Sequence, residues 1–267
     1  MVKIHLISDL FLDFHEFSIE EEVIPDVDLC VINGNIGMIK RCMLYAETLS
    51  RKYPDIQFVI NLGQYELYEA FNEKFKDELH ENILIRKNTN SSWPKNLHYS
   101  REPIQIKVKS GYTLDILCLY GFPLIYNTAI PWEQTNWHKF YKMEIDNTDT
   151  PEGRWYKPKN SSNVCHGDFP IMATKDYIHK LHIDEENKAR TWELANNNCK
   201  KILITHINPY MDSKLVNQTV APFNIHLYNG YWLTSDTKVN GIMFMGGKLY
   251  SNPGRGTDAR SHVITVD

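Results

Sequence analysis

Short apolar segments alternate with longer amphipathic segments along the first third of the chain. The apolar runs are rich in branched residues and close on Gly or Asn, which predicts buried strands at residues 2–7, 29–32 and 58–62. The longer segments predict helices at residues 38–53 and 66–80. This alternation of strand and helix indicates parallel strands joined by right-handed crossovers.

The rest of the chain adds hairpins to this pattern. Short polar or Gly-rich turns separate the members of two strand pairs, which are residues 104–108 with 113–119 and residues 241–245 with 248–251. Further strands are predicted at residues 202–205 and 262–266. Hairpins mixed with parallel units indicate an α/β fold in which two packed mixed sheets are flanked by helices.

Two further segments complete the predicted organisation. Residues 184–198 form a good helical pattern, with Asp184 as a candidate N-cap. Residues at about 127–168 are irregular and carry three tryptophans, which either anchor an ordered loop on the body or offer stacking platforms. We therefore expect a single domain over residues 1–267 with an aromatic-containing insert. The tryptophans of the insert are Trp132, Trp137 and Trp155.

Composition narrows the class of protein. The chain has 267 residues, of which 42% are hydrophobic and 23% are charged, and this suits a globular domain with a full core. A formal net charge of −4 argues against bulk binding of nucleic acid, although a local basic patch would still be compatible with it. No apolar run approaches the roughly 18 residues of a membrane-spanning helix. The chain begins directly in a predicted strand, so we expect no signal peptide.

The cysteines point to a reducing compartment. Their number is odd and none forms a Cys-x-x-Cys pair, which is typical of scattered free thiols and predicts a cytoplasmic protein. The five are Cys30, Cys42, Cys118, Cys165 and Cys199.

Polar residues follow the predicted strands at successive positions. Functional groups of open α/β sheets gather at the carboxyl ends of strands, so these positions are candidates for a binding site. Taken singly, Asp9 could cap a turn, His206 could be a turn histidine and Arg255 could belong to a Pro-Gly turn. Because all of them follow predicted strands, we expect them to lie in one pocket. The candidates are Asp9, Asn35, Gln64, His206, Asp236, Lys238 and Arg255.

The order and spacing of these residues resemble the calcineurin-like metallophosphoesterases, in particular the compact bacterial and phage phosphohydrolases. That family carries the motifs D-x-H, G-D, G-N-H-E, a lone H, G-H-x-H and a closing N-P-x-G. The corresponding positions here begin at Asp9, Gly34, Gly63, His206, Ser235 and Asn252, with Asp236 and Lys238 in place of the final histidine pair. The resemblance extends over almost the whole chain. It implies a calcineurin-like four-layer αββα sandwich. It also implies two metal ions that clamp a phosphate and activate a bridging hydroxide.

The chain departs from the family at most of the metal-binding positions. Phe11 stands where the motif has a histidine, and Asn35 stands where it has the bridging aspartate. By the resemblance, the first metal would use these two residues with Asp9 and Lys238. Since Phe11 cannot coordinate and Lys238 is a cation, we expect no metal there. The Lys238 ammonium would instead pair with Asp9.

The second metal position keeps more donors. By the resemblance it would use Asn35, Gln64, His206 and Asp236, which offer one formal negative charge and suit a single Mn, Mg or Zn ion. Tyr65 stands where the family has the histidine that protonates the leaving group, and phenols are poor acids at neutral pH. Phe11 and Tyr65 are expected to fill the space of the lost ligands.

Two functions follow from these departures. The favoured one is a pseudoenzyme that needs no cofactor and binds an unknown protein partner or a phosphate-containing ligand, such as a nucleotide or a nucleic-acid end. The alternative is a phosphomonoesterase or phosphodiesterase that runs on one divalent cation. In that case Tyr65 and His206 would be the catalytic candidates, and Arg255 could hold a phosphate in bidentate fashion.

Overall fold

The computed structural model describes residues 1–10, 12, 18–63, 66, 73–119, 175–195, 198–206, 230–234, 243–245, 247–251 and 263–266. The predicted insert at about 127–168 lies outside these residues. No helix within the described ranges is long and apolar enough to cross a membrane.

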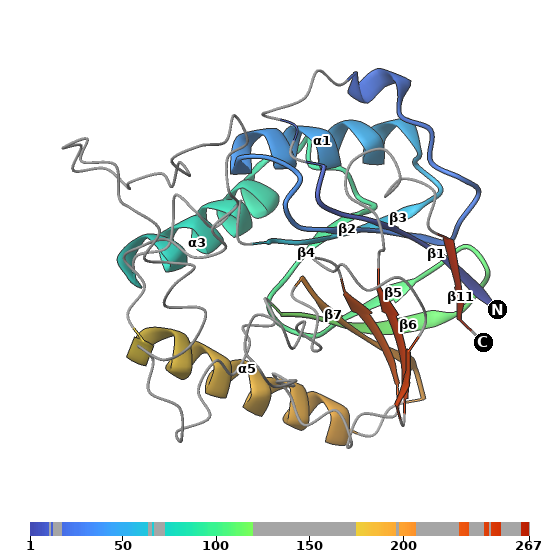
Figure 1. Ribbon diagram of the computed structural model, residues 1–267. Helices are drawn as coiled ribbons and strands as arrows, with labels where there is room; N and C mark the ends of the chain where they lie inside the picture. The colour runs from blue at the N-terminus through green and yellow to red at the C-terminus, as the bar shows by residue number, and fades with distance from the viewer. Residues whose placement is uncertain are drawn as a thin grey trace, which may run out of the picture.

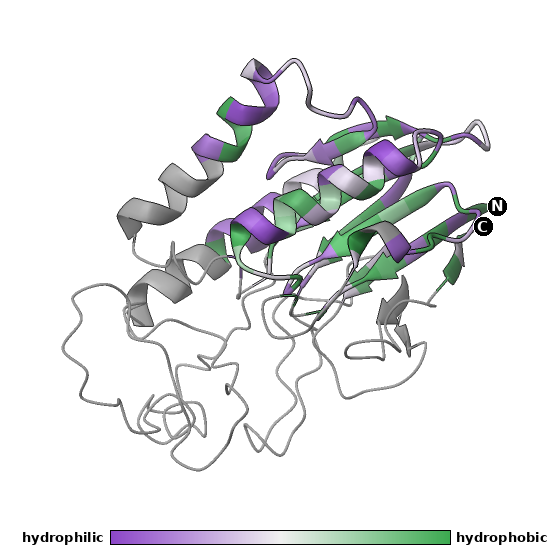
Figure 2. Cartoon of the chain, turned by 90° about the horizontal axis from the view of Figure 1, so that it is seen from above, coloured by the Kyte–Doolittle hydropathy of each residue, from purple (hydrophilic) through white to green (hydrophobic). Residues whose placement is uncertain are grey.

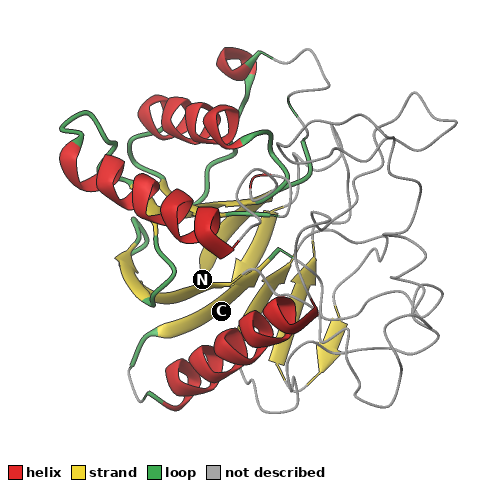
Figure 3. Ribbon diagram, turned by 90° about the vertical axis from the view of Figure 1, so that its left-hand side faces the viewer, coloured by secondary structure: helices red, strands yellow, loops and turns green. Residues whose placement is uncertain are grey.

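Two mixed sheets form the centre of the molecule (Figures 1 and 3). The first has the order β11-β1-β2-β3-β4, and only β11 runs antiparallel to its neighbour. The second has the order β5-β6-β7-β8-β10-β9, with antiparallel strands at both edges. The first sheet contains β1 (Val2–Ile7), β2 (Leu29–Asn33), β3 (Gln57–Asn61), β4 (Leu97–Tyr99) and β11 (Val263–Val266). The second contains β5 (Ile104–Lys107), β6 (Thr113–Leu119), β7 (Lys200–Thr205), β8 (Tyr231–Thr234), β9 (Met243–Met245) and β10 (Gly247–Ser251).

Helices cover the outer faces of the two sheets. A short helix η1 (Ile19–Glu21), α1 (Ile39–Lys52) and α3 (Glu73–Thr89) belong to the side of the first sheet, and α5 (Lys175–Leu194) belongs to the side of the second (Figure 1). The strands are largely hydrophobic, whereas the helices also carry hydrophilic residues (Figure 2). The predicted αββα layering and the two mixed sheets are confirmed.

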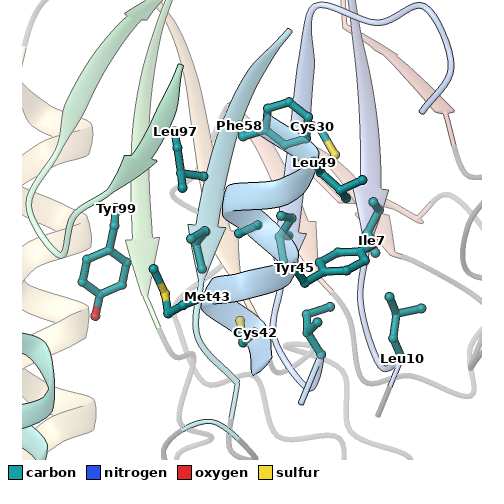
Figure 4. Close-up of a cluster of buried hydrophobic side chains, with 14 of the residues drawn as sticks. Ile7, Leu10, Cys30, Cys42, Met43, Tyr45, Leu49, Phe58, Leu97 and Tyr99 are labelled. Atoms are coloured by element: carbon teal, nitrogen blue, oxygen red, sulfur yellow. The ribbon is translucent and has the colours of Figure 1, made fainter. Parts of the chain in front are cut away.

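The central strands β2 and β3 of the first sheet are buried on both faces. Alternate residues such as Cys30 and Ile32 pack against α1, while Leu29 and Val31 face the second sheet. Figure 4 shows the first of these clusters, in which Tyr45 lies beside the strands. The second sheet continues the pattern, and its outer face packs against Trp192 of α5. Continuous apolar strands follow from burial on two faces, which is why they were recognisable in the sequence.

Two predicted helices have different bounds in the structure, and two strands were not predicted. The α5 helix begins at Lys175, so Asp184 lies inside it and is not an N-cap; no Gly or Pro interrupts residues 175–194. For the same reason α3 continues past residue 80 and ends at Thr89. The strands β4 and β8 were not predicted, because each is short and pairs with its neighbours in parallel, so that no hairpin turn marks it in the sequence.

Candidate functional site

Three of the predicted site residues lie where strands of the two sheets end. Asp9 follows β1 and Asn35 follows β2 in the first sheet, while His206 follows β7 in the second. Asp9 and Asn35 are each 2% exposed and His206 is fully buried. Buried polar groups must find partners, so the contacts of these side chains determine what the site can do.

Asp9 and Asn35 face one another through matched turns. Both have a φ of 55°, a left-handed conformation that Asn and Asp tolerate better than other residues with a Cβ. The Asp9 N–H donates to the Gly34 carbonyl at 3.0 Å, and Asn35 Nδ2 donates to Asp9 Oδ1 at 3.0 Å. The backbone therefore aims the amide of one turn at the carboxylate of the next.

Two glycines allow the strand-end loops to touch. A Cβ on Gly34 would lie 2.4 Å from the Gly63 nitrogen and 2.6 Å from His206 Nδ1. A Cβ on Gly63 would lie 2.8 Å from Asn35 Oδ1. These approaches leave no room for a side chain at either position. They show that Asn35 and His206, which come from different sheets, both lie beside the contact between Gly34 and Gly63.

Glu66 connects the same two strand-end loops through hydrogen bonds to their main chains. Its carboxylate accepts hydrogen bonds from the N–H groups of Asn35 at 2.9 Å, Ile36 at 2.6 Å and Gly63 at 2.8 Å, with Gly37 more distant at 3.4 Å. Burial raises the pKa of the Glu66 carboxyl, while nearby His206 and the N–H donors oppose that shift. Both oxygens are occupied by main-chain donors, so Glu66 is an anchor for the loops.

His206 is oriented by a main-chain carbonyl. Its Nδ1 lies 2.6 Å from the Asn33 oxygen, and since a carbonyl can only accept, Nδ1 carries the proton. In the neutral ring, the lone pair is then on Nε2. A histidine that binds a metal commonly has one ring nitrogen hydrogen-bonded to a carbonyl in this way and the other nitrogen bound to the metal.

Asn35 stands where the resemblance implies a bridging carboxylate, and its side chain donates a hydrogen bond to Asp9. A carboxylate only accepts hydrogen bonds, so the Asn35 amide must turn its nitrogen toward Asp9. A cation shared by these residues would need the amide oxygen there instead. Among the described residues, no group of three or more His, Cys, Asp or Glu side chains could hold a metal.

The remaining sequence-predicted residues cannot be placed against these three. They are Phe11, Gln64, Tyr65, Asp236, Lys238 and Arg255, and all lie outside the described residues. Of the proposed single-metal ligands, only Asn35 and His206 are described, and these two lie beside the same glycine contact.

Comparison with protein-family models and with curated proteins finds no match. Among solved structures, the phosphopantetheinyl hydrolase of Mycobacterium tuberculosis matches over 96% of this chain and 90% of its own, with a TM-score of 0.60 and 10% identity. The chain has the calcineurin-like phosphoesterase fold. A dimetal phosphatase from Danio rerio covers 98% of this chain and 89% of its own at 10% identity, but its TM-score of 0.39 is too low to support an argument.

Sequence reasoning gave no role to three polar residues at this edge of the fold. Glu66 was visible only as the last position of a motif, and Asn33 and Asn61 were not singled out. A signal was present, because Val-Ile-Asn occurs at the end of both β2 and β3, at residues 31–33 and 59–61. An amide that closes two adjacent buried strands must find hydrogen-bond partners nearby.

Proposed function

We propose that this chain is a catalytically degenerate metallophosphoesterase homologue that acts by binding. Its ligand would be a protein partner or a phosphate-containing molecule, such as a nucleotide or a nucleic-acid end. The hydrogen bond from Asn35 Nδ2 to Asp9 Oδ1 supports this proposal most directly. At the position that the resemblance gives to a bridging carboxylate, a neutral amide donates a hydrogen bond and leaves one carboxylate charge in place of two.

The expected loss of activity follows from charge and from proton transfer. Removing a single group that stabilises the transition state costs on the order of 3–4 kcal/mol in enzymes. Here Asn35 lacks the bridging charge, and by the resemblance Phe11 and Tyr65 replace a ligand and an acid. Several such losses together leave little metal-dependent hydrolysis.

The first experiment measures metal and turnover on the same preparation. Elemental mass spectrometry of chelator-free protein and calorimetric titration with Mn²⁺ should show no bound metal. Phosphomonoester and phosphodiester substrates should turn over at background rates with and without Mn²⁺. Turnover that Mn²⁺ stimulates and His206→Ala abolishes would overturn the proposal.

Binding is then measured directly. Nucleoside phosphates and 5′-phosphorylated oligonucleotides, titrated into the full chain, separate a phosphate ligand from a protein partner. A phosphate ligand should bind in the absence of metal and should lose affinity in Arg255→Ala if that side chain holds the phosphate. Affinity for none of these probes would favour a protein partner.

The orientation of His206 favours a second candidate, a phosphoesterase that uses one metal ion. Its protonated Nδ1 leaves Nε2 as the donor for a cation, and Asn35, Gln64 and Asp236 would complete the ligand set. The cation would polarise a phosphate oxygen, and Lys238 would add a fixed positive charge. About one equivalent of Mn²⁺, lost in Asp236→Ala, is the result that would select this function.

A reducing compartment, the cytoplasm, is the location that we propose. Of the described cysteines, Cys30, Cys42, Cys118 and Cys199 are thiols and not members of a disulfide. Burial raises the pKa of the Cys118 thiol to about 12, so it stays protonated. In the native protein, Cys118 should therefore resist alkylation while partly exposed Cys199 reacts, which mass spectrometry after iodoacetamide treatment can measure.

A further inference from the structure

At the carboxyl ends of their parallel strands, both sheets finish in a pair of residues that lie opposite one another on neighbouring strands. Asn33 and Asn61 are paired at the ends of β2 and β3, and Leu119 and Thr205 are paired at the ends of β6 and β7. All four are at most 1% exposed. The last pair of one sheet therefore lies against the last pair of the other, inside the protein.

Two side-chain amides join these ends across the gap between the sheets. Asn33 Nδ2 donates to the Thr205 carbonyl at 2.9 Å, and Asn61 Nδ2 donates to the Leu119 carbonyl at 2.9 Å. The second hydrogen of Asn61 Nδ2 goes to Asn33 Oδ1 at 2.9 Å. We call Asn33 and Asn61 the amide clamp.

Contacts of Arg101 orient the Asn61 side chain of the clamp. Arg101 Nη1 lies 3.4 Å from Asn61 Oδ1, and Arg101 also pairs with Glu185 of α5 at 2.5 Å. A guanidinium only donates, so the Asn61 oxygen must face outward to Arg101 and its nitrogen must face inward. Both partners of that ion pair are largely buried.

The clamp closes an otherwise apolar interface. Val31 and Val59 of the first sheet pack on Cys118 and Ile204 of the second. Apolar packing is not directional, so it favours close contact without specifying one offset between the sheets. Hydrogen bonds need both distance and angle, and they therefore select one relative position of the strand ends.

Asn33 connects this interface to His206. Its side chain holds the carbonyl of Thr205 and its own carbonyl accepts from His206 Nδ1, so two consecutive residues of the second sheet are bound to one residue of the first. Two positions further along the chain, Asn35 contacts Asp9. The contacts of Asn33 therefore fix the distance between His206 and the Asp9–Asn35 pair.

We propose that Asn33 and Asn61 are positioning residues that set the distance between the two sheets and thereby hold His206 in its Nδ1-protonated tautomer beside the Gly34–Asn35 turn. The role is independent of which proposed function is correct, because a binding pocket and a single-metal site both combine groups from the two sheets. Asn61 acts at a distance, since its described hydrogen bonds reach His206 only through Asn33 or through β6.

The test measures the tautomer of the His206 ring by NMR and needs no ligand or metal. In the full chain labelled with ¹⁵N-histidine, long-range ¹H–¹⁵N correlation distinguishes the two tautomers, and His206→Gln identifies the signal. The wild type should show a protonated Nδ1 whose hydrogen exchanges slowly with water. In Asn61→Leu, the slow exchange should be lost and the neutral ring should become a mixture of tautomers.

Asn96→Leu is the matched control. The Asn96 amide is also buried and donates to three main-chain carbonyls, at 3.0 Å to Ser50, 3.1 Å to Tyr53 and 2.7 Å to Ile56. It joins α1 to the start of β3, away from the site. Both leucine variants should lower the Tm by about 5 °C, but only Asn61→Leu should alter the His206 signals.

Unchanged His206 signals in Asn61→Leu, with a Tm as low as that of Asn96→Leu, would overturn the proposal and leave the clamp a structural feature alone. If Asn61→Leu fails to fold, Asn61→Ser provides the same test, because its hydroxyl is too short to reach Leu119. An altered His206 in Asn96→Leu would also count against the proposal, since any loss of stability would then suffice. Failure of the proposed binding function leaves all these readings unaffected.

Discussion

Two buried carboxylates at the same edge of the fold are held in different ways. Glu66 accepts from the main-chain N–H groups of two strand-end loops, whereas Asp9 accepts from the side chain of Asn35. Main-chain donors are present whatever the residue, so the Glu66 contacts are built into the loop geometry. The Asp9 contact depends on one side chain and changes if that residue changes. Burial alone therefore does not distinguish an anchor from a site residue; the origin of the donors does.

Replacing the anchor should have the largest effect. In Glu66→Gln, one amide nitrogen would point its hydrogens at the N–H groups that the carboxylate now binds. We expect a loss of about 3 kcal/mol in the free energy of unfolding, measured by urea denaturation. Glu47→Gln is the control, because buried Glu47 is bonded to the half-exposed side chains of Arg51 and Arg86, which can turn to water. A smaller loss in Glu66→Gln than in Glu47→Gln would contradict the comparison.

The same anchor should give a pH dependence of stability. Burial raises the folded-state pKa of Glu66 above its usual 4.5, so in the window above 4.5 the native state binds more protons than the unfolded state. The Glu66 contribution to stability is therefore most favourable below pH 4.5 and is lost as pH rises through the folded-state pKa. Urea denaturation across this window should show that slope in the wild type and a reduced slope in Glu66→Gln. Equal slopes would contradict the direction of the pKa shift.

Introducing a carboxylate at position 35 tests how far Asp9 depends on the Asn35 side chain. Asn35→Asp would bring two carboxylates together, and without a cation they should share a proton and destabilise the protein by about 2 kcal/mol at neutral pH. Asp tolerates the left-handed φ as Asn does, so backbone strain should not change. Adding Mn²⁺ should raise the Tm of this variant and leave the wild type unchanged. An equal rise in both proteins would show that the natural site already binds the metal.

The smallest effect should come from Asp9→Asn. The change weakens the hydrogen bond that Asp9 accepts from the neutral Asn35 amide, and we expect a loss of about 1 kcal/mol in the free energy of unfolding. The sequence also predicts that Lys238 pairs with Asp9. A loss of about 3 kcal/mol or more, matched by Lys238→Ala, would show that Asp9 has a buried ionic partner and that this carboxylate is more than a hydrogen-bond acceptor.

The sequence by itself determined the layers of this protein. Strands β1 and β6 have the predicted bounds and α1 differs by one residue at each end, because burial on one or two faces leaves a period or an unbroken apolar run in the sequence. The strand-end positions of Asp9, Asn35 and His206 followed from the same reasoning. Motif resemblance supplied the fold, which the structural match then bore out.

Only the tertiary structure decided how those positions are held. The amide of Asn33 meets a carbonyl 172 residues away, and that of Asn61 meets one 58 residues away. A period describes which face of an element is buried, but it contains no information on which distant strand end will lie opposite. That information comes from the packing of one sheet on the other. For this reason the hydrogen-bond partners of Glu66, Asn33 and Asn61 became visible only when the chain was folded.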